Sequence, residues 1–354
     1  MRSRPLLGSC LLLAAVLATA CGGSTPLAPT PTPTPASTAA VYVAGFEASG
    51  AYDPTFGEYA AVAMIWKNGV ATKLTDGTRG AVAHSVALSG SDVYVAGSQA
   101  DGAHALAVVW KNGVATKLTD GTQGAAASSV AISGSDVYVA GYEATATAVV
   151  AMVWNNGVAI QLTDGTQVAY ATSVAISGSD VYVAGYEANG THEVAMVWKN
   201  GVATKVTDGT RAIAHSVAVS GSDVYVAGYE SNGAYEVAKV WKNGVATKLT
   251  DGTQVAYANS VAVSGNDVYV AGVENEAAMV WKNGVATKLA GTVGNRTGEA
   301  YAESVAIFES DVYVAGSQAD GAHAVAVVWK NGVATKLTDG TRDAHAYSIA
   351  VSPH

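Results

Sequence analysis

Cysteine is nearly absent from this sequence, which has two cysteines in 354 residues. Cys10 lies within residues 1–20, which have the features of an export signal: Arg2 and Arg4 precede an apolar stretch and then a group of small residues. Cleavage after this segment removes Cys10 and leaves Cys21 as the single cysteine. The sequence therefore excludes an intrachain disulfide.

Charge is also scarce. Charged residues make up 13% of the chain and apolar residues 49%, a balance that fits sheets buried on both faces. The formal net charge is −9, and the lysines are spread along the chain instead of forming a cluster. Because nucleic-acid phosphates require a basic patch, we expect no nucleic-acid partner.

Helical periodicity and the common catalytic motifs are missing. No window has the 3.6-residue apolar spacing of an amphipathic helix. There is no G-x-S-x-G elbow and no phosphate-binding G-x-x-x-x-G-K-[ST] loop. His192-Glu193 begins like H-E-x-x-H, but Met196 stands where the second histidine would be, and no D-x-D-x-D-G calcium motif occurs. We therefore expect no catalytic residue, no cofactor and no metal site.

What the sequence does contain is a repeat that uses most of the chain. Seven copies of V-Y-V-A-G are each followed by a tryptophan, and seven copies of S-(V/I)-A accompany them. Most copies are 43 or 44 residues apart. The V-Y-V-A-G copies begin at Val41, Val93, Val137, Val181, Val224, Val268 and Val312.

Each repeat is predicted to form four short β-strands. The apolar runs are rich in Val, Tyr, Trp, Thr and Ile, which suit pleated, half-buried surfaces, and turn residues separate them. Asn-Gly joins the third and fourth runs, and this pair favours a two-residue hairpin turn because both residues tolerate positive φ. Four strands per 43 or 44 residues is the spacing of a propeller blade. The predicted fold class is all-β, a seven-bladed β-propeller of four-stranded blades.

The ends of the repeat region predict how the ring closes. The region opens at Val41 with a second strand, and the chain finishes with Ser348 to Ser352, a first strand with nothing after it. Together the two fragments make one complete blade, so we expect the N- and C-terminal strands to pair. A linear solenoid would leave both fragments without a partner.

The V-Y-V-A-G array resembles the YVTN family of propeller repeats, whose signature strand reads V-Y-V-T-N. The resemblance extends from Val41 to Ser352 through a few positions per repeat, with Ala-Gly here in place of Thr-Asn. Proteins similar to this are bacterial surface or secreted proteins. The resemblance therefore implies a seven-bladed propeller at a bacterial surface.

The segment before the propeller is predicted to be a lipidated tether. Apolar residues, then small residues, then Cys21 resemble the lipobox of bacterial lipoproteins. The Pro/Thr-rich stretch behind Cys21 favours an extended polyproline II spacer. We therefore predict a signal peptide at 1–20, a tether at 21–40 and a propeller at 41–354, anchored to the membrane of a bacterial cell envelope by lipid on Cys21 and facing the periplasm or the cell surface. Cleavage by ordinary signal peptidase, which would give a secreted protein, is the alternative.

Seven polar residues, one per blade, are predicted to surround the mouth of the propeller channel. They come directly before the first strands, on the face shared by the 2–3 loops and the 4–1 loops: His84, Ser128, Thr172, His215, Asn259, Glu303 and Tyr347. One interpretation is that a hydrated rim simply prefers polar side chains. The other is a ligand-binding ring, with contacts from His84, His215, Asn259, Glu303 and Tyr347.

Two irregular loops on the same face are predicted to form a lip beside this ring. The loop from Ala48 to Tyr59 is longer than its counterparts and contains Asp53 and Phe56. The loop from Ala290 to Glu303 replaces T-D-G-T and adds Arg296 and Glu299. Neutral drift of surface loops is the alternative explanation.

These features predict a binding or interaction scaffold tethered to the cell envelope, with a polysaccharide or a protein as its partner. Loops displayed on a rigid scaffold are a common location for binding sites. We expect a monomer. The alternatives are a propeller enzyme, such as a glycan lyase or hydrolase with a single site at the channel mouth, and a purely structural envelope protein.

Overall fold

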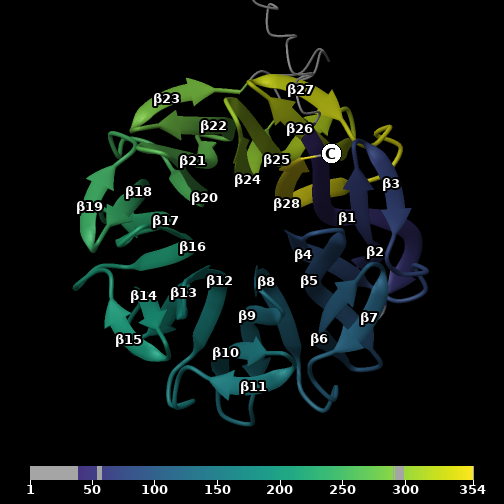
Figure 1. The fold of residues 1–354 in the computed structure, drawn as a ribbon, viewed down its shortest axis with the longest axis horizontal. Coiled ribbons are helices and arrows are strands. Elements are labelled where there is room, and N and C mark those ends of the chain that lie inside the picture. The colour runs from purple at the N-terminus through teal and green to yellow at the C-terminus, as the bar shows by residue number, and fades with distance from the viewer. Residues whose placement is uncertain (1–38, 54–57, 290, 292–298, 354) are drawn as a thin grey trace, which may run out of the picture. The chain divides into compact units, whose positions relative to one another are not determined.

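The computed structural model describes residues 39–53, 58–289, 291 and 299–353. These residues form seven antiparallel sheets of four strands each, arranged around a common axis (Figure 1). The predicted fold class is confirmed. We number the sheets as blades 1 to 7 in the order in which their second strands occur in the chain.

Strands are given from the axis outward. Blade 1 contains β28 (Ala344–Pro353), β1 (Ala39–Asp53), β2 (Glu58–Lys67) and β3 (Val70–Lys73). Blade 2 contains β4 (Ala81–Ser89), β5 (Asp92–Asp101), β6 (His104–Lys111) and β7 (Val114–Lys117). Blade 3 contains β8 (Ala125–Ser133), β9 (Asp136–Ala144), β10 (Val149–Asn155) and β11 (Val158–Gln161). Blade 4 contains β12 (Ala169–Ser177), β13 (Asp180–Ala188), β14 (Glu193–Lys199) and β15 (Val202–Lys205).

The remaining blades follow the same order. Blade 5 contains β16 (Ala212–Ser220), β17 (Asp223–Ser231), β18 (Glu236–Lys242) and β19 (Val245–Lys248). Blade 6 contains β20 (Ala256–Ser264), β21 (Asp267–Glu274), β22 (Ala277–Lys282) and β23 (Val285–Lys288). Blade 7 contains β24 (Ala300–Phe308), β25 (Asp311–Asp320), β26 (His323–Lys330) and β27 (Val333–Lys336).

The Asn-Gly turn joins the two outer strands of each blade in the predicted conformation. In blade 2, Asn112 and Gly113 have φ angles of 51° and 82°, as a type I′ turn requires. The Asn112 side chain accepts the Val93 N–H at 2.9 Å and donates to Asp92 at 2.7 Å. Lys111 pairs with the same aspartate at 2.8 Å. The K-N-G and S-G-S-D motifs therefore bond to each other across one face of the ring, which we call the turn face.

The ring closes between the two ends of the described chain. β28 pairs with β1 from end to end, from Pro353 opposite Ala39 to Ala344 opposite Glu47. This pairing supplies the missing inner strand of blade 1, as the incomplete repeats at the chain ends predict. Figure 1 shows β28 beside β1, between blades 7 and 2.

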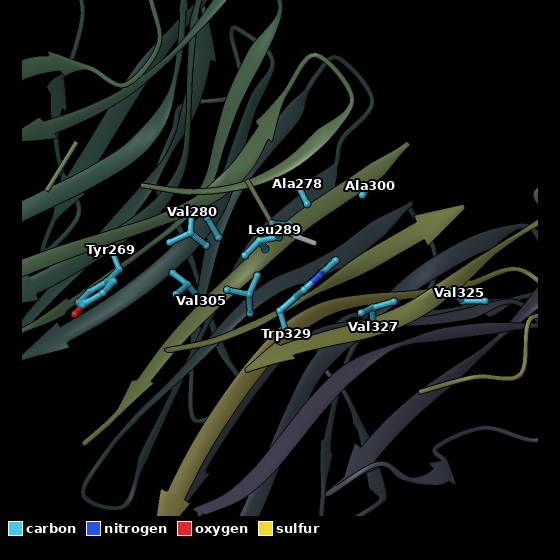
Figure 2. Close-up of a cluster of buried hydrophobic side chains, with 12 residues drawn as sticks. Tyr269, Ala278, Val280, Leu289, Ala300, Val305, Val325, Val327 and Trp329 are labelled. Atoms are coloured by element: carbon cyan, nitrogen blue, oxygen red, sulfur yellow. The ribbon is translucent and has the colours of Figure 1, made fainter. Parts of the chain in front are cut away.

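The hydrophobic core lies between the blades. Seven clusters of buried side chains each combine residues of two neighbouring blades. Figure 2 shows the cluster in which Tyr269 and Val280 of blade 6 face Val305, Val327 and Trp329 of blade 7. The tyrosine of V-Y-V thus packs on the side of its sheet that faces the next blade. The repeat tryptophan of that next blade packs on the side that faces back, so both residues lie in the same interface. Each blade needs both neighbours to bury its two faces.

A complete ring of hydrogen bonds joins the inner strands. The serine of each S-(V/I)-A motif accepts the N–H of the following position in the next blade, with N···Oγ distances of 3.1–3.2 Å in all seven cases. For example, the Val130 N–H donates to Ser85 Oγ at 3.2 Å. The inner strand has no sheet neighbour on its axial side, so the serine satisfies an N–H that the sheet leaves without a partner.

Candidate functional site

The seven predicted ring residues lie inside the inner strands and not before them. Each inner strand begins four residues earlier than the sequence suggested. Its pairing with the second strand shifts at the ring residue: Ala83 lies opposite Gly97 and Ser85 opposite Ala96, so His84 occupies a β-bulge. The same shift occurs in every blade. The prediction that these residues precede the strands is therefore wrong, because a bulge depends on a register that the sequence does not display.

The bulge also explains the glycine of V-Y-V-A-G. A Cβ atom on Gly97 would lie 2.0 Å from the carbonyl oxygen of Val82, which the bulge pushes toward the second strand. The other six blades have the same close approach at the equivalent glycine. The glycine that stands here in place of the Asn of V-Y-V-T-N is thus required by the local backbone geometry.

Side chains at the bulges bind neighbouring blades. Three of them contact the carbonyl oxygen just before the next bulge residue: Thr172 contacts Ala214 at 2.8 Å, His215 contacts Ala258 at 3.2 Å and Asn259 contacts Ala302 at 3.1 Å. All seven residues are half-buried. These three ring residues therefore contribute to the cohesion of the blades, whichever of the two interpretations from the sequence applies.

The structure brings Asn259, Glu303, Tyr347 and His84 together on one arc of the ring. Asn259 Nδ2 donates to Glu303 Oε2 at 3.1 Å, and the His84 and Tyr347 rings stack with centroids 5.9 Å apart. Burial raises the pKa of Glu303 to about 7. Burial and the nearby Glu303 carboxyl raise the pKa of Tyr347 to about 12. Glu303 can therefore exchange a proton near neutral pH.

The two histidines of the ring, His84 and His215, are uncharged near neutral pH. Burial lowers the pKa of His84 to about 4. Burial also lowers the pKa of His215, although its contacts with Ala258 and Asn259 oppose the shift. The ring therefore offers neutral hydrogen-bonding groups and one titrating carboxyl, an arrangement suited to a polar, uncharged ligand.

The predicted lip is described only in part. Phe56 and Arg296 lie outside the described residues. β1 and β2 continue to Asp53 and Glu58, which pair with each other, so the described parts of the expected loop from Ala48 to Tyr59 belong to these two strands. Glu299 lies at the edge of blade 7 and accepts a hydrogen bond from the Tyr301 hydroxyl at 3.2 Å.

The loop face carries an arc of tyrosines that the sequence did not predict: Tyr142, Tyr170, Tyr186, Tyr229 and Tyr257. Tyr170 stacks on Tyr186 with centroids 5.1 Å apart and meets Tyr142 of blade 3 edge-on at 4.7 Å. The arc continues on blades 5 and 6, where Tyr229 and Tyr257 meet edge-on at 5.1 Å. Tyrosine after V-Y-V-A-G in blades 3, 4 and 5 was the available signal. It was missed because a strand aromatic is ordinarily assigned to the core.

A charged group lies beside this arc. Arg211 pairs with Glu193 at 2.9 Å and with Glu236 at 3.0 Å, and its guanidinium lies 5.7 Å from the centre of the Tyr229 ring. A backbone hydrogen bond, and then the bond to Arg211, lower the pKa of Glu193. A guanidinium and two carboxylates therefore lie beside the buried ring of Tyr229, at the edge of the tyrosine arc, and polar groups next to aromatic surface are common in ligand sites.

Metal-binding clusters and membrane-spanning helices are absent from the described residues. These residues contain no group of three or more His, Cys, Asp or Glu side chains that could hold a metal ion. Nor do they contain a helix that is long and apolar enough to cross a membrane.

The fold and site define a closed seven-bladed β-propeller scaffold. No family model and no curated protein matches the chain. Among solved structures, the β-propeller domain of the Trilobed protease from Pyrococcus furiosus is similar at 10% identity, with 85% of this chain and 93% of that chain covered and a TM-score of 0.53. That domain is described as having an open velcro topology, whereas the terminal strands pair here.

A second solved structure is TolB from Acinetobacter baumannii. It is 9% identical with a TM-score of 0.47, and 69% of this chain is covered. This chain spans 60% of the length of that protein.

Proposed function

We propose that this protein is a saccharide-binding scaffold tethered to the cell envelope, with its ligand platform on the loop face. The arc formed by Tyr142, Tyr170 and Tyr186 carries this proposal. A pyranose ring presents C–H groups on its faces and hydroxyls around its rim. Aromatic rings accommodate the faces, while nearby polar groups accept and donate hydrogen bonds.

Polar groups beside the arc match the rim of a sugar. Asn189 and His192 lie in the 2–3 loop of blade 4, where Asn189 Nδ2 is 3.1 Å from His192 Nε2. The Arg211–Glu193 pair lies near the same blade. Beyond this arc, the bulge residues His215, Asn259, Glu303, Tyr347 and His84 are further candidates for contacts with a long chain.

The turn face is a poor candidate by comparison. It presents closely similar turns in blades 2 and 4 to 7, where the polar groups of the Lys, Asn and Asp are bonded to one another. Groups that already satisfy one another contribute less to a new partner.

Binding of the purified protein to an array of cello-oligosaccharides, chitin oligosaccharides and peptidoglycan fragments tests the proposal. Tyr170→Leu and Tyr186→Leu should each weaken binding about tenfold because a Leu side chain cannot offer a flat face. Tyr170→Phe, which keeps the ring, should retain most of it.

Lys199→Ala and Lys242→Ala, on the turn face, are the control variants and should leave affinity unchanged. Loss of binding in these controls, with full affinity in the tyrosine variants, would overturn the proposal. Binding of an envelope protein in place of any saccharide would support a protein-interaction scaffold instead.

A further inference from the structure

The 2–3 hairpin of blade 6 is shorter than those of its neighbours. In blade 6 the paired residues Gly272 and Met279 are seven positions apart, whereas Gly228 and Lys239 in blade 5 are eleven apart. The connection is a two-residue turn in which Asn275 and Glu276 have φ angles of 47° and 61°. Blade 6 therefore stops short on the loop face.

A cavity of about 610 Å³ lies at this short hairpin. Three tyrosines from three blades line it: Tyr235 from the 2–3 loop of blade 5, Tyr257 from β20 and Tyr301 from β24. Val255 and Val273 add apolar surface. Tyr235 is 41% exposed and the other two rings are half-buried, so aromatic surface remains accessible.

The described residues at the cavity carry negative charge. Glu276 is the one charged residue among the described lining residues, and Glu299 accepts the hydroxyl hydrogen of Tyr301 at 3.2 Å. Burial, and then Glu299 and Glu276, raise the pKa of Tyr301. Lys288 lines a neighbouring cavity of about 300 Å³, of which Glu276 is also a lining residue.

Arg211, a described arginine that acts electrostatically on Tyr257, does not reverse this charge. Arg211 pairs with both Glu193 and Glu236, so the three groups together carry one net negative charge. A positively charged ligand would therefore meet aromatic faces and carboxylates with no uncompensated cation among the described lining residues.

We propose that this cavity binds an organic ammonium group, held against Tyr235, Tyr257 and Tyr301 and neutralised by Glu276 and Glu299. Aromatic faces attract cations through the ring quadrupole, and alkylated ammonium groups lose little hydration when they bind there. The inference goes beyond the proposed saccharide platform, because Tyr170 and Tyr186 line no part of this cavity.

Titration of the full protein with choline, followed by ligand-observed NMR, tests the inference. The alcohol 3,3-dimethyl-1-butanol has the same shape as choline but no charge. Choline should therefore bind, and the alcohol should not. Tyr301→Leu should weaken choline binding about five- to tenfold, and Tyr301→Phe should weaken it much less because the ring is kept. Glu276→Gln should weaken it about threefold or more.

Each variant has a matched control in the same chain. Tyr170→Leu changes the same repeat position three blades away, and Glu309→Gln changes a glutamate that also has a positive φ, in a turn on the opposite face. Both control substitutions, Tyr170→Leu and Glu309→Gln, should leave choline binding unchanged. Equal binding of the neutral alcohol, equal loss in the controls, or no saturable binding of choline up to about 10 mM would overturn the inference.

Discussion

The serine of each inner strand acts as the missing hydrogen-bond partner of the next blade. Ser260 Oγ accepts the Val305 N–H at 3.2 Å, in a part-buried position. Removing the hydroxyl leaves a donor without its acceptor, and such a loss costs about 1 to 3 kcal/mol. The motif S-(V/I)-A is therefore explained by contacts between blades.

Ser260→Ala should lower the free energy of unfolding by about 1 to 2 kcal/mol, measured by chemical denaturation. Ser222→Ala is the matched control, because Ser222 is exposed in the turn before β17, and it should change stability by less than about 0.5 kcal/mol. Equal effects of the two substitutions would contradict the assigned role of the serine ring.

Glu303 predicts a pH dependence of stability. Burial raises its pKa from 4.5 to about 7, so between these values the folded chain binds a proton that the unfolded chain has released. The protonated carboxyl thus favours the folded state at low pH, and this contribution is lost as the pH rises toward 7.

Glu303→Gln removes that titration and leaves the buried histidines in place. The stability of the variant relative to the parent should therefore increase between pH 5 and pH 8, as measured by denaturant unfolding at both values. Parallel pH profiles of the two proteins would show that the carboxyl does not titrate in this range.

Residue-level prediction from sequence succeeded where a residue type alone decides the geometry. Asn112 and Gly113 are an example, because positive φ at two successive positions selects them. It failed for His84, whose place in a bulge depends on pairing with a strand that lies eight or more residues away. It also failed for Tyr170, whose aromatic partners come from two other strands.

At the scale of elements, β28 and β1 are the decisive pair. β28 is the inner strand of blade 1, and its Ile349 packs with Val43 and Trp66 in the cluster between blades 7 and 1. Its Ser348 also accepts the Val86 N–H of blade 2. The incomplete repeats at the two ends made this closure predictable.

Deletion of residues 348–354 should lower the melting temperature strongly, because it exposes an edge of β1 and removes contacts with both neighbouring blades. Circular dichroism melts of the truncated and parent proteins would measure the effect. A shorter truncation that removes only Pro353 and His354 is the control and should melt near the parent. An unchanged melting temperature after the longer deletion would show that terminal pairing adds little to stability.

At the scale of the whole molecule, the seven near-identical repeats made the architecture predictable. The spacing gives the number of blades, and the alternating apolar runs give four strands in each. The candidate site was less predictable, because the ligand face is assembled from loops and strand ends of different blades. Such neighbours are determined by the closed ring and not by any local pattern.

The location of the protein rests on the predicted lipid at Cys21, which lies outside the described residues. Cys21→Ser should leave the membrane fraction or accumulate as an unprocessed precursor, because acylation needs the thiol. Cell fractionation and mass spectrometry of the N-terminus would measure this. A fully cleaved Cys21→Ser protein that stays in the membrane would mean that lipid is not the anchor.

The closure of blade 1 brings the two ends of the propeller close enough to be joined, so that the chain could be opened at another position. Ala39 and Pro353 lie opposite each other on adjacent antiparallel strands, so a hairpin linker such as Asn-Gly could join them. Blade 1 is joined to both neighbouring blades by the same serine hydrogen bonds as the other blades: Ser304 accepts the Ile349 N–H, and Ser348 accepts the Val86 N–H. Circular permutants that begin in the 2–3 loop of any one blade should therefore assemble the same propeller. The order of blades around the axis would stay the same, and only the position of the chain ends would change.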